Sequence, residues 1–249
     1  TGGSNTALGG NALDANTTAS NNTAIGKSSL GNNSTGGNNV GCGWGSLGQN
    51  STASNNTAVG YNCLGANTTG TELTAVGSNA LAANTTADNN TAVGLHALLS
   101  NTTGASNTAL GRIALQANTT ASNNTGIGAR ALLSNTTGAS NVAVGANALD
   151  ENTTANDNTA VGTNALSANT TGDNNVAIGT NAADSITTGS RNVAIGSQAL
   201  ASFTTSNDTV AIGYQTLDAQ TTGSGNTAIG VSAMSTATTG QNNTAVGNA

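Results

Sequence analysis

The sequence predicts an all-β fold, a parallel β-solenoid with 17 residues per coil and about 14 coils. A glycine follows a short apolar run at every seventeenth residue, with no insertion or deletion along the chain. Such strict periodicity places every repeat in the same structural environment, as in solenoids. In addition, only 2% of the residues are aromatic and 6% are charged. This composition does not supply an ordinary globular core, whereas stacked repeats need none.

The repeat begins at Asn5, and its positions are numbered here from one to seventeen. Fourteen complete repeats run over residues 5–242, with the consensus N-T-A-V-G-x-N-A-L-x-A-N-T-T-G-x-N. We expect a single uninterrupted array over 1–249 that is part of a longer fibre, because the pattern continues to both ends. With coils about 4.8 Å apart, such an array forms a rod about 65–70 Å long.

Positions two to four predict a short strand. Position two is Thr or Val, position three is Ala or Gly, and position four is aliphatic except at Cys42. Positions two and four point the same way in a strand. We expect position four to form a core ladder and the small position three to face another part of the coil or another subunit. The predicted core ladder includes Ile25, Val59, Val93, Ile127, Val161, Ile195 and Ile229.

Position five is glycine in every copy and predicts the corner of the coil, where a backbone conformation unfavourable to a β-carbon is needed. The corner glycines are Gly9, Gly26, Gly43, Gly60, Gly77, Gly94, Gly111, Gly128, Gly145, Gly162, Gly179, Gly196, Gly213, Gly230 and Gly247.

Position nine is almost always leucine and predicts a second core ladder with a second short strand around it. Position one is almost always asparagine, and it often follows Asn or Ser. Asparagine tolerates left-handed turns and bonds its own backbone, so we expect a turn here, and stacked asparagines can also form ladders between coils. The leucine column includes Leu13, Leu47, Leu81, Leu115 and Leu149, with Ala183 and Met234 as departures.

Position fourteen is threonine in every complete repeat, and it suggests an ice-binding face as one hypothesis. A regular row of hydroxyl and methyl groups can order water, although adjacent residues at thirteen and fourteen point to opposite faces. One threonine file would then be accompanied by the asparagine at position twelve. The array consists of Thr18, Thr35, Thr52, Thr69, Thr86, Thr103, Thr120, Thr137, Thr154, Thr171, Thr188, Thr205, Thr222 and Thr239.

Three aromatic residues, Trp44, Tyr61 and Tyr214, share position six just past the glycine corner. We expect them to be exposed. Exposed aromatic rings can bind a sugar or a protein partner, and they can also be tolerated surface side chains without a role.

The sequence offers no catalytic, cofactor-binding or metal site that we would assign. His96 is the only histidine and occupies a variable position, which argues against catalysis. The segment Gly26-Lys27-Ser28 lacks the leading glycine of a phosphate-binding loop. Four aspartates share position ten, but most repeats carry other residues there, so calcium binding is not expected. These aspartates are Asp14, Asp150, Asp184 and Asp218.

Charge and hydropathy also limit the partners. The net charge of −6 and only four scattered cationic residues leave no basic stripe for nucleic acid. No apolar run is long enough to span a membrane, and no signal peptide is recognisable. Cys42 and Cys63 replace an aliphatic residue and an alanine, so we expect buried free thiols, with a disulfide as the alternative.

The segments Asn175–Gly179, Asn192–Gly196 and Val210–Gly213 read N-V-A-I-G, N-V-A-I-G and V-A-I-G. They resemble the S-V-A-I-G signature of the YadA-like head repeats of trimeric autotransporter adhesins. The looser consensus also resembles repeats of phage tail-fibre-like proteins. The resemblance covers nearly the whole chain. It implies a left-handed parallel β-roll in a side-by-side homotrimer, with Val176, Ile178 and their equivalents filling each roll.

We therefore predict a non-enzymatic extracellular fibre segment on a cell surface or virion, the shaft or head of a trimeric adhesin or tail fibre. It would space or present a binding surface, with itself and a host surface protein or glycan as partners. The alternatives are a filament subunit that assembles end to end and the ice-binding solenoid.

Overall fold

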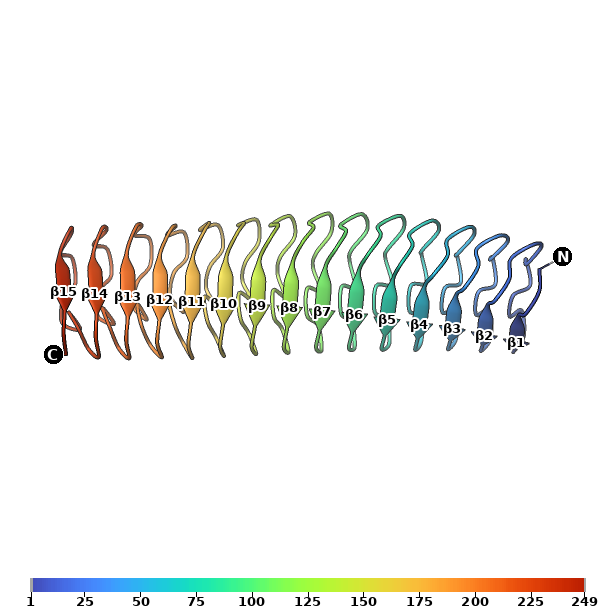
Figure 1. Ribbon diagram of the computed structural model, residues 1–249, viewed down its shortest axis with the longest axis horizontal. Coiled ribbons are helices and arrows are strands. Elements are labelled where there is room, and N and C mark those ends of the chain that lie inside the picture. The colour runs from blue at the N-terminus through green and yellow to red at the C-terminus, as the bar shows by residue number, and fades with distance from the viewer. Residues whose placement is uncertain (1, 249) are drawn as a thin grey trace. The chain divides into compact units, whose positions relative to one another are not determined.

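The computed structural model describes residues 2–248 and consists of three-residue strands joined by turns. The chain divides into two units, Thr1–Asn123 and Asn124–Ala249. Each coil contributes one strand (Figure 1). Unit 1 holds β1 (Thr6–Leu8), β2 (Thr23–Ile25), β3 (Val40–Cys42), β4 (Thr57–Val59), β5 (Thr74–Val76), β6 (Thr91–Val93) and β7 (Thr108–Leu110). Unit 2 holds β8 (Thr125–Ile127), β9 (Val142–Val144), β10 (Thr159–Val161), β11 (Val176–Ile178), β12 (Val193–Ile195), β13 (Val210–Ile212), β14 (Thr227–Ile229) and β15 (Thr244–Val246).

Within each unit, consecutive strands pair in parallel and in register. In unit 1, Ala24 pairs with Ala7 and Gly41, and in unit 2, Ala160 pairs with Ala143 and Ala177. Residues with the same repeat position therefore stack on one another from coil to coil. The prediction of an all-β parallel solenoid with 17 residues per coil is confirmed.

The inward face of the strand is the opposite of the predicted one. The small residue at position three is buried in all coils but the first and last, whereas the aliphatic residue at position four lies on the outer surface. Ile25, Ile178 and Ile229 keep 39%, 40% and 39% of their surface exposed. The predicted core ladder is therefore wrong, and so is the expectation from the resemblance that Val176 and Ile178 fill the roll.

The reason for the inward small residue is a narrow interior. A Cβ added at Gly41 would lie 2.5 Å from Ser29 Oγ and 3.2 Å from Ser46 Oγ, two side chains at position eight. Position eight is Ala in most coils, so two small residues face each other across the interior. A valine or isoleucine at position three would overlap this column.

The leucine column at position nine is buried, as predicted, but no strand forms around it. Leu47 and Leu81 have φ values of 52° and 51°, and positions seven and seventeen adopt the same left-handed conformation, as at Asn62 and Asn55. Three left-handed residues per coil bend the chain repeatedly, which leaves only one strand. The second-strand prediction is therefore wrong, although the burial of leucine is right.

The corner glycines have φ values between +124° and +143°, which confirms the predicted turn. At Gly60 a Cβ would also lie 2.7 Å from the carbonyl oxygen of Gly77 in the next coil. Both the backbone conformation and the close approach of the next coil exclude a side chain here.

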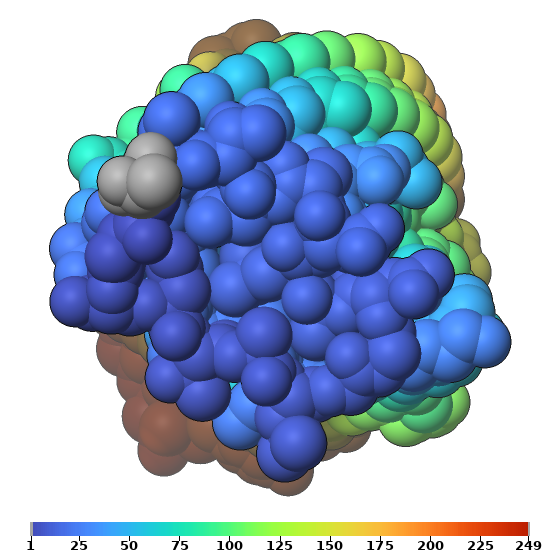
Figure 2. Space-filling view, turned by 90° about the vertical axis from the view of Figure 1, so that its right-hand side faces the viewer, coloured from blue at the N-terminus to red at the C-terminus, as the bar shows by residue number. Residues whose placement is uncertain are grey.

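Two files of buried asparagine fill the remainder of the interior, at positions one and twelve. Asn67 Nδ2 donates to Asn50 Oδ1 of the preceding coil at 3.1 Å and to the carbonyl of Gly70 at 2.9 Å. At position one, the backbone N–H of Asn56 donates to Asn39 Oδ1 at 3.0 Å. The predicted asparagine ladder is confirmed, and the left-handed turn falls on the residue before it. Figure 2 shows that atoms of the N-terminal coils fill the end face of unit 1.

Candidate functional site

The aromatic residues Trp44 and Tyr61 form a stacked pair on the surface of unit 1. Their ring centroids lie 4.9 Å apart with an interplanar angle of 11°. Each follows a corner glycine, and because the coils are in register the two rings fall above one another. They keep 48% and 53% of their surface exposed. The predicted exposure is therefore confirmed for this pair.

Tyr214 occupies the same repeat position in unit 2 and is also exposed, at 48%. Its neighbours in the column, Ser197 and Val231, are not aromatic, so it has no stacking partner there. The structure thus joins two of the three predicted aromatic residues into one feature and leaves the third as a separate side chain.

A groove of about 350 Å³ lies beside Trp44. Its aromatic side is Trp44, its polar groups come from positions seven, ten and eleven, and glycines form its floor. The lining residues are Asn11, Asp14, Ser28, Gly31, Asn32, Trp44, Gly45, Gly48, Gln49, Asn62 and Gly65. The groove therefore crosses the first four coils of unit 1.

The glycines of this groove were not predicted from the sequence. Gly31, Gly48 and Gly65 occupy position ten in three consecutive coils, where the next coils carry Ala82 and Leu99. None of the three has a φ in the left-handed region, so the backbone does not require glycine there. Their effect is to remove side chains. Three glycines in succession at a position that otherwise carries a side chain were the available signal.

The polar side chains of the groove are four amides, the hydroxyl of Ser28 and the carboxylate of Asp14. Asn32 Nδ2 donates to Gln49 Oε1 at 2.9 Å, and Asn62 Nδ2 donates to Asn79 Oδ1 at 3.2 Å. These bonds fix the amide planes but give Gln49 Nε2 and Asn62 Oδ1 no protein partner among residues 2–248. Asp14 is exposed and has no partner within residues 2–248. The groove therefore offers both hydrogen-bond donors and acceptors.

The threonine column at position fourteen is exposed in all fourteen complete coils. Its hydroxyls bond to no protein group in the described chain. By contrast, hydroxyls at position thirteen are used within the fold, since Thr68 Oγ1 donates to the carbonyl of Thr85 at 3.0 Å. The asparagines at position twelve are buried from Asn33 to Asn169, so the expected asparagine companion file is wrong for these coils.

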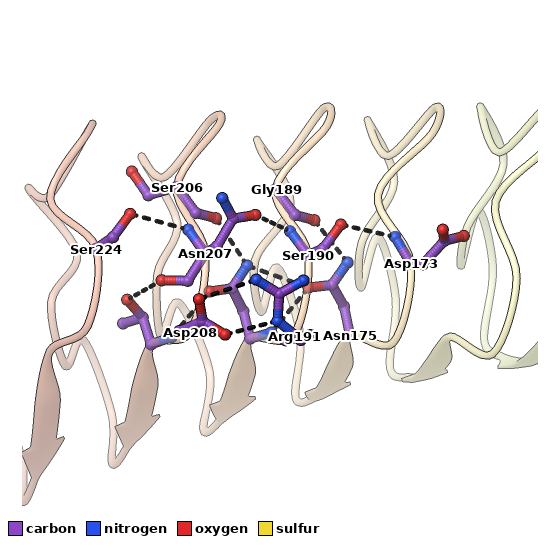
Figure 3. A network of polar contacts seen from close by, with 11 residues as sticks. Asp173, Asn175, Gly189, Ser190, Arg191, Ser206, Asn207, Asp208 and Ser224 are labelled. Atoms are coloured by element: carbon purple, nitrogen blue, oxygen red, sulfur yellow. Dashed lines mark hydrogen bonds and ion pairs between the residues drawn. The ribbon is translucent and has the colours of Figure 1, made fainter.

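A polar network crosses several coils of unit 2 (Figure 3). The backbone N–H of Asp173 donates to Ser190 Oγ at 3.1 Å, that of Ser190 to Asn207 Oδ1 at 2.7 Å, and that of Asn207 to Ser224 Oγ at 3.1 Å. Each side-chain oxygen at position sixteen thus accepts a hydrogen bond from the backbone N–H of position sixteen in the preceding coil. This network joins successive coils.

Arg191 and Asp208 form a bidentate ion pair beside this network. Arg191 Nε lies 2.6 Å from Asp208 Oδ1, and Nη2 lies 2.9 Å from Oδ2. The hydrogen bond from Arg191 lowers the pKa of Asp208, and the same bond raises the pKa of Arg191. Both side chains are exposed, so the pair is a surface feature.

The remaining candidate residues do not converge. His96 is half-buried, and its Nε2 lies 3.4 Å from Asn79 Nδ2. Within residues 2–248, no cluster of three or more His, Cys, Asp or Glu side chains could hold a metal ion. Of the position-ten aspartates, Asp150 pairs with Arg130 at 3.1 Å. Burial raises the pKa of Asp184.

Cys42 and Cys63 are free thiols. Cys63 is buried, as predicted, and its burial raises the pKa of the thiol. Cys42 is only half-buried, because position four faces outward.

The residues that the structure describes contain no helix long and apolar enough to cross a membrane. A comparison with models of known protein families found no match, and a search of curated proteins found no significantly similar sequence.

Proposed function

We propose that this chain is a non-enzymatic segment of an extracellular fibre, the shaft or head of a trimeric adhesin or of a phage tail fibre. In this role it spaces or presents a binding surface. The observation that carries the proposal is the outward-facing column at position four. One aliphatic residue per coil, Cys42 excepted, lies on the surface of both units.

This column favours association with further copies of the chain. Positions two and four carry only Thr, Val, Ile, Leu and one Cys, and no charged residue, although the chain has a net charge of −6. Exposed side chains such as Ile25 and Val59 in unit 1 and Ile178 in unit 2 repeat with the coils. A row of apolar side chains that repeats along one unit marks an interaction surface more often than an isolated apolar residue does. Side-by-side packing of three copies would cover it.

The mass of the chain in solution tests this proposal. We expect sedimentation equilibrium to give three times the chain mass of 23.7 kDa. A stable monomer would contradict both the trimer and any filament. Polymers that grow with concentration would instead favour the alternative of a subunit that assembles end to end.

Two matched variants locate the interface. Val161→Glu places a charge in the outward column, and Thr171→Glu places the same charge at position fourteen of the same coil. We expect Val161→Glu to dissociate the trimer because burying an unpaired carboxylate is costly, and Thr171→Glu to leave it intact. If both variants remain trimeric, the outward column is not the interface.

Cys42 supplies a second readout. It lies in the outward column, whereas Cys63 lies inside unit 1. In the trimer we expect both thiols to react slowly with a maleimide, and in dissociated Val161→Glu we expect Cys42 alone to react quickly. Fast reaction of Cys42 in the parent chain would show that this face is free.

The exposed threonine column keeps ice binding as a second candidate function. All fourteen hydroxyls are free of protein partners in the described residues and recur once per coil. Thermal hysteresis and ice-crystal shaping by the purified chain test it directly, and the absence of both at high concentration would remove it. Replacing Thr103, Thr120 and Thr137 by lysine would abolish any effect that depends on this column.

A further inference from the structure

The groove beside Trp44 differs from the rest of the coil surface in one respect that the repeat does not explain. Coils elsewhere place a side chain at position ten, for example Leu99 and Leu133, whereas the three coils at the groove have Gly31, Gly48 and Gly65. The fold accepts leucine at this position. The coil backbone therefore does not demand the three glycines. At Gly31 and Gly48 the missing side chain leaves space, whereas at Gly65 the Asn62 amide occupies the position of an added Cβ.

The aromatic side of the groove is held in place. Tyr61 covers one face of the Trp44 indole at a centroid distance of 4.9 Å, while other atoms of Trp44 line the groove. Only Trp44 of the two contacts the groove. Tyr61 is therefore a positioning residue, and Trp44 is the residue that a ligand would contact.

The polar lining indicates the chemistry of that ligand. The amides of Asn11, Asn32, Gln49 and Asn62 line the groove, and those of Asn32, Gln49 and Asn62 each use one polar atom in the bonds described above. Their remaining polar atoms and the Ser28 hydroxyl supply donors and acceptors, and the carboxylate of Asp14 supplies acceptors. No lysine or arginine lines the groove within the described chain, which disfavours sulfated or phosphorylated ligands. A ligand with an apolar face and many hydroxyls matches this combination of one aromatic ring and several amides.

We propose that this groove binds a neutral oligosaccharide, with the C–H face of one sugar ring on Trp44 and its hydroxyls on the amides and Asp14. The volume of about 350 Å³ lies near the lower end of the range for ligand sites, roughly 300–1,000 Å³, and so fits a short saccharide. The inference rests on the proposed function, because it names the ligand class of the binding surface that the fibre presents.

The only tryptophan of the chain lies in the groove, so its fluorescence reports on this site alone. The experiment titrates the full chain with maltotriose, cellotriose, laminaritriose, chitotriose and N-acetyllactosamine while Trp44 emission is recorded. We expect a saturable change with at least one of these saccharides. No change in emission with any of them up to about 10 mM would overturn the proposal, because a dissociation constant above this concentration is too weak for a specific site.

Filling the groove gives the matched test. Gly48→Leu places a side chain on the floor that other coils tolerate, and Ala82→Leu makes the equivalent change at the same repeat position outside the groove. We expect Gly48→Leu to weaken binding by at least about tenfold and Ala82→Leu to leave it unchanged. Equal binding by parent and Gly48→Leu would overturn the proposal. If Gly48→Leu fails to fold by circular dichroism, Gly31→Leu makes the same test.

The oligomeric state separates this inference from the proposed function. An intact trimer that binds no saccharide contradicts the proposed saccharide site but not the proposed fibre. A monomer that binds saccharide through the groove contradicts the proposed trimeric fibre but not the site. A saccharide-independent emission change with a peptide or protein ligand, blocked by Gly48→Leu, would assign the groove to a protein partner and overturn the saccharide proposal.

Discussion

Asn39 and Asn50 donate their side-chain amides to the same acceptor, the carbonyl oxygen of Ala53, at 2.9 and 3.0 Å. The two asparagine files therefore converge in each such coil on one backbone oxygen. Asn50 also donates to Asn33 Oδ1 at 2.8 Å in the preceding coil. Because these groups are buried, each file joins its coil to the next through bonds that water cannot replace.

The first prediction concerns this buried amide. Asn50→Asp replaces a donor by an acceptor that faces the Ala53 carbonyl and Asn33 Oδ1, and it also buries a charge. We expect a loss of about 3–5 kcal/mol of unfolding free energy. Asn50→Leu, which leaves its partners unsatisfied without a charge, should cost less, about 1–3 kcal/mol. Guanidinium unfolding followed by circular dichroism measures both.

Asn89→Asp is the matched control for this change. Asn89 is exposed at position seventeen, where other coils carry Asp157 and Asp208. We expect its stability to stay within about 0.5 kcal/mol of the parent. A comparable loss in Asn89→Asp and Asn50→Asp would show that the buried file has no special role.

The second prediction concerns the corner. Gly60→Ala forces a side chain onto a backbone with a φ of +136° and brings Cβ within 2.7 Å of the Gly77 carbonyl oxygen. We expect a loss of at least about 2 kcal/mol. Gly10→Ala has open space around its Cβ, and Ala129 shows that alanine is tolerated at the same position, so it should have almost no effect. Equal melting temperatures for the two variants would contradict this account.

The third prediction uses a natural interruption of the position-twelve file. Ile186 and Phe203 replace asparagine in two successive coils and are fully buried. Asn169 is the last asparagine before them, and the next coil offers no asparagine to donate to its Oδ1. This oxygen accepts a bond from the backbone N–H of Gly172 at 3.2 Å. Ile186→Asn and Phe203→Asn should each destabilise the chain, because the new amide has an amide side chain at position twelve in only one of the two adjoining coils.

The double variant Ile186→Asn, Phe203→Asn restores a continuous file from Asn169 to position 203. We expect the loss of unfolding free energy in the double variant to be smaller than the sum of the two single losses by about 1 kcal/mol or more, since the two amides bond each other. Chemical denaturation of the four proteins in the cycle measures this coupling. Strict additivity would show that the file does not propagate between coils.

The fourth prediction is a pH dependence from the Arg191–Asp208 pair. The pKa of Asp208 is lowered in the folded chain by the bond from Arg191. The stabilisation is therefore present above the ordinary carboxyl pKa of about 4 and is lost as the pH falls through the lower folded value. Asp208→Asn should remove this part of the acid sensitivity, which thermal unfolding between acid and neutral pH measures.

The pKa of Asp184 is shifted in the opposite direction to that of Asp208, so the two residues change stability with pH in opposite ways. Burial raises its pKa, so its contribution is most favourable at acid pH and is lost as the pH rises through the folded value. Asp184→Asn should therefore steepen the loss of stability on acidification, whereas Asp208→Asn should reduce it. The same direction of change in both variants would contradict the assigned causes.

The period, the corner and the register followed from the order of the residues alone. A glycine at every seventeenth residue requires the same turn in every coil, and identical repeats can pair only in register, since any slip would misplace every column at once. The exposure of Trp44 and Tyr61 also followed from their position after the corner. Their stacking could not be read from the spacing alone, because it depends on the rotamers of two neighbouring coils.

The inward face of the strand, in contrast, depends on how the side chains of one coil pack in three dimensions. The segment Thr57-Ala58-Val59 alternates, and alternation separates two faces without saying which is the core. Inside the coil, leucine and two asparagine files occupy the space, so only Ala58 fits and Val59 faces outward. The groove was decided in the same way, because Gly31, Gly48 and Gly65 acquire meaning only when the fold places them side by side next to Trp44.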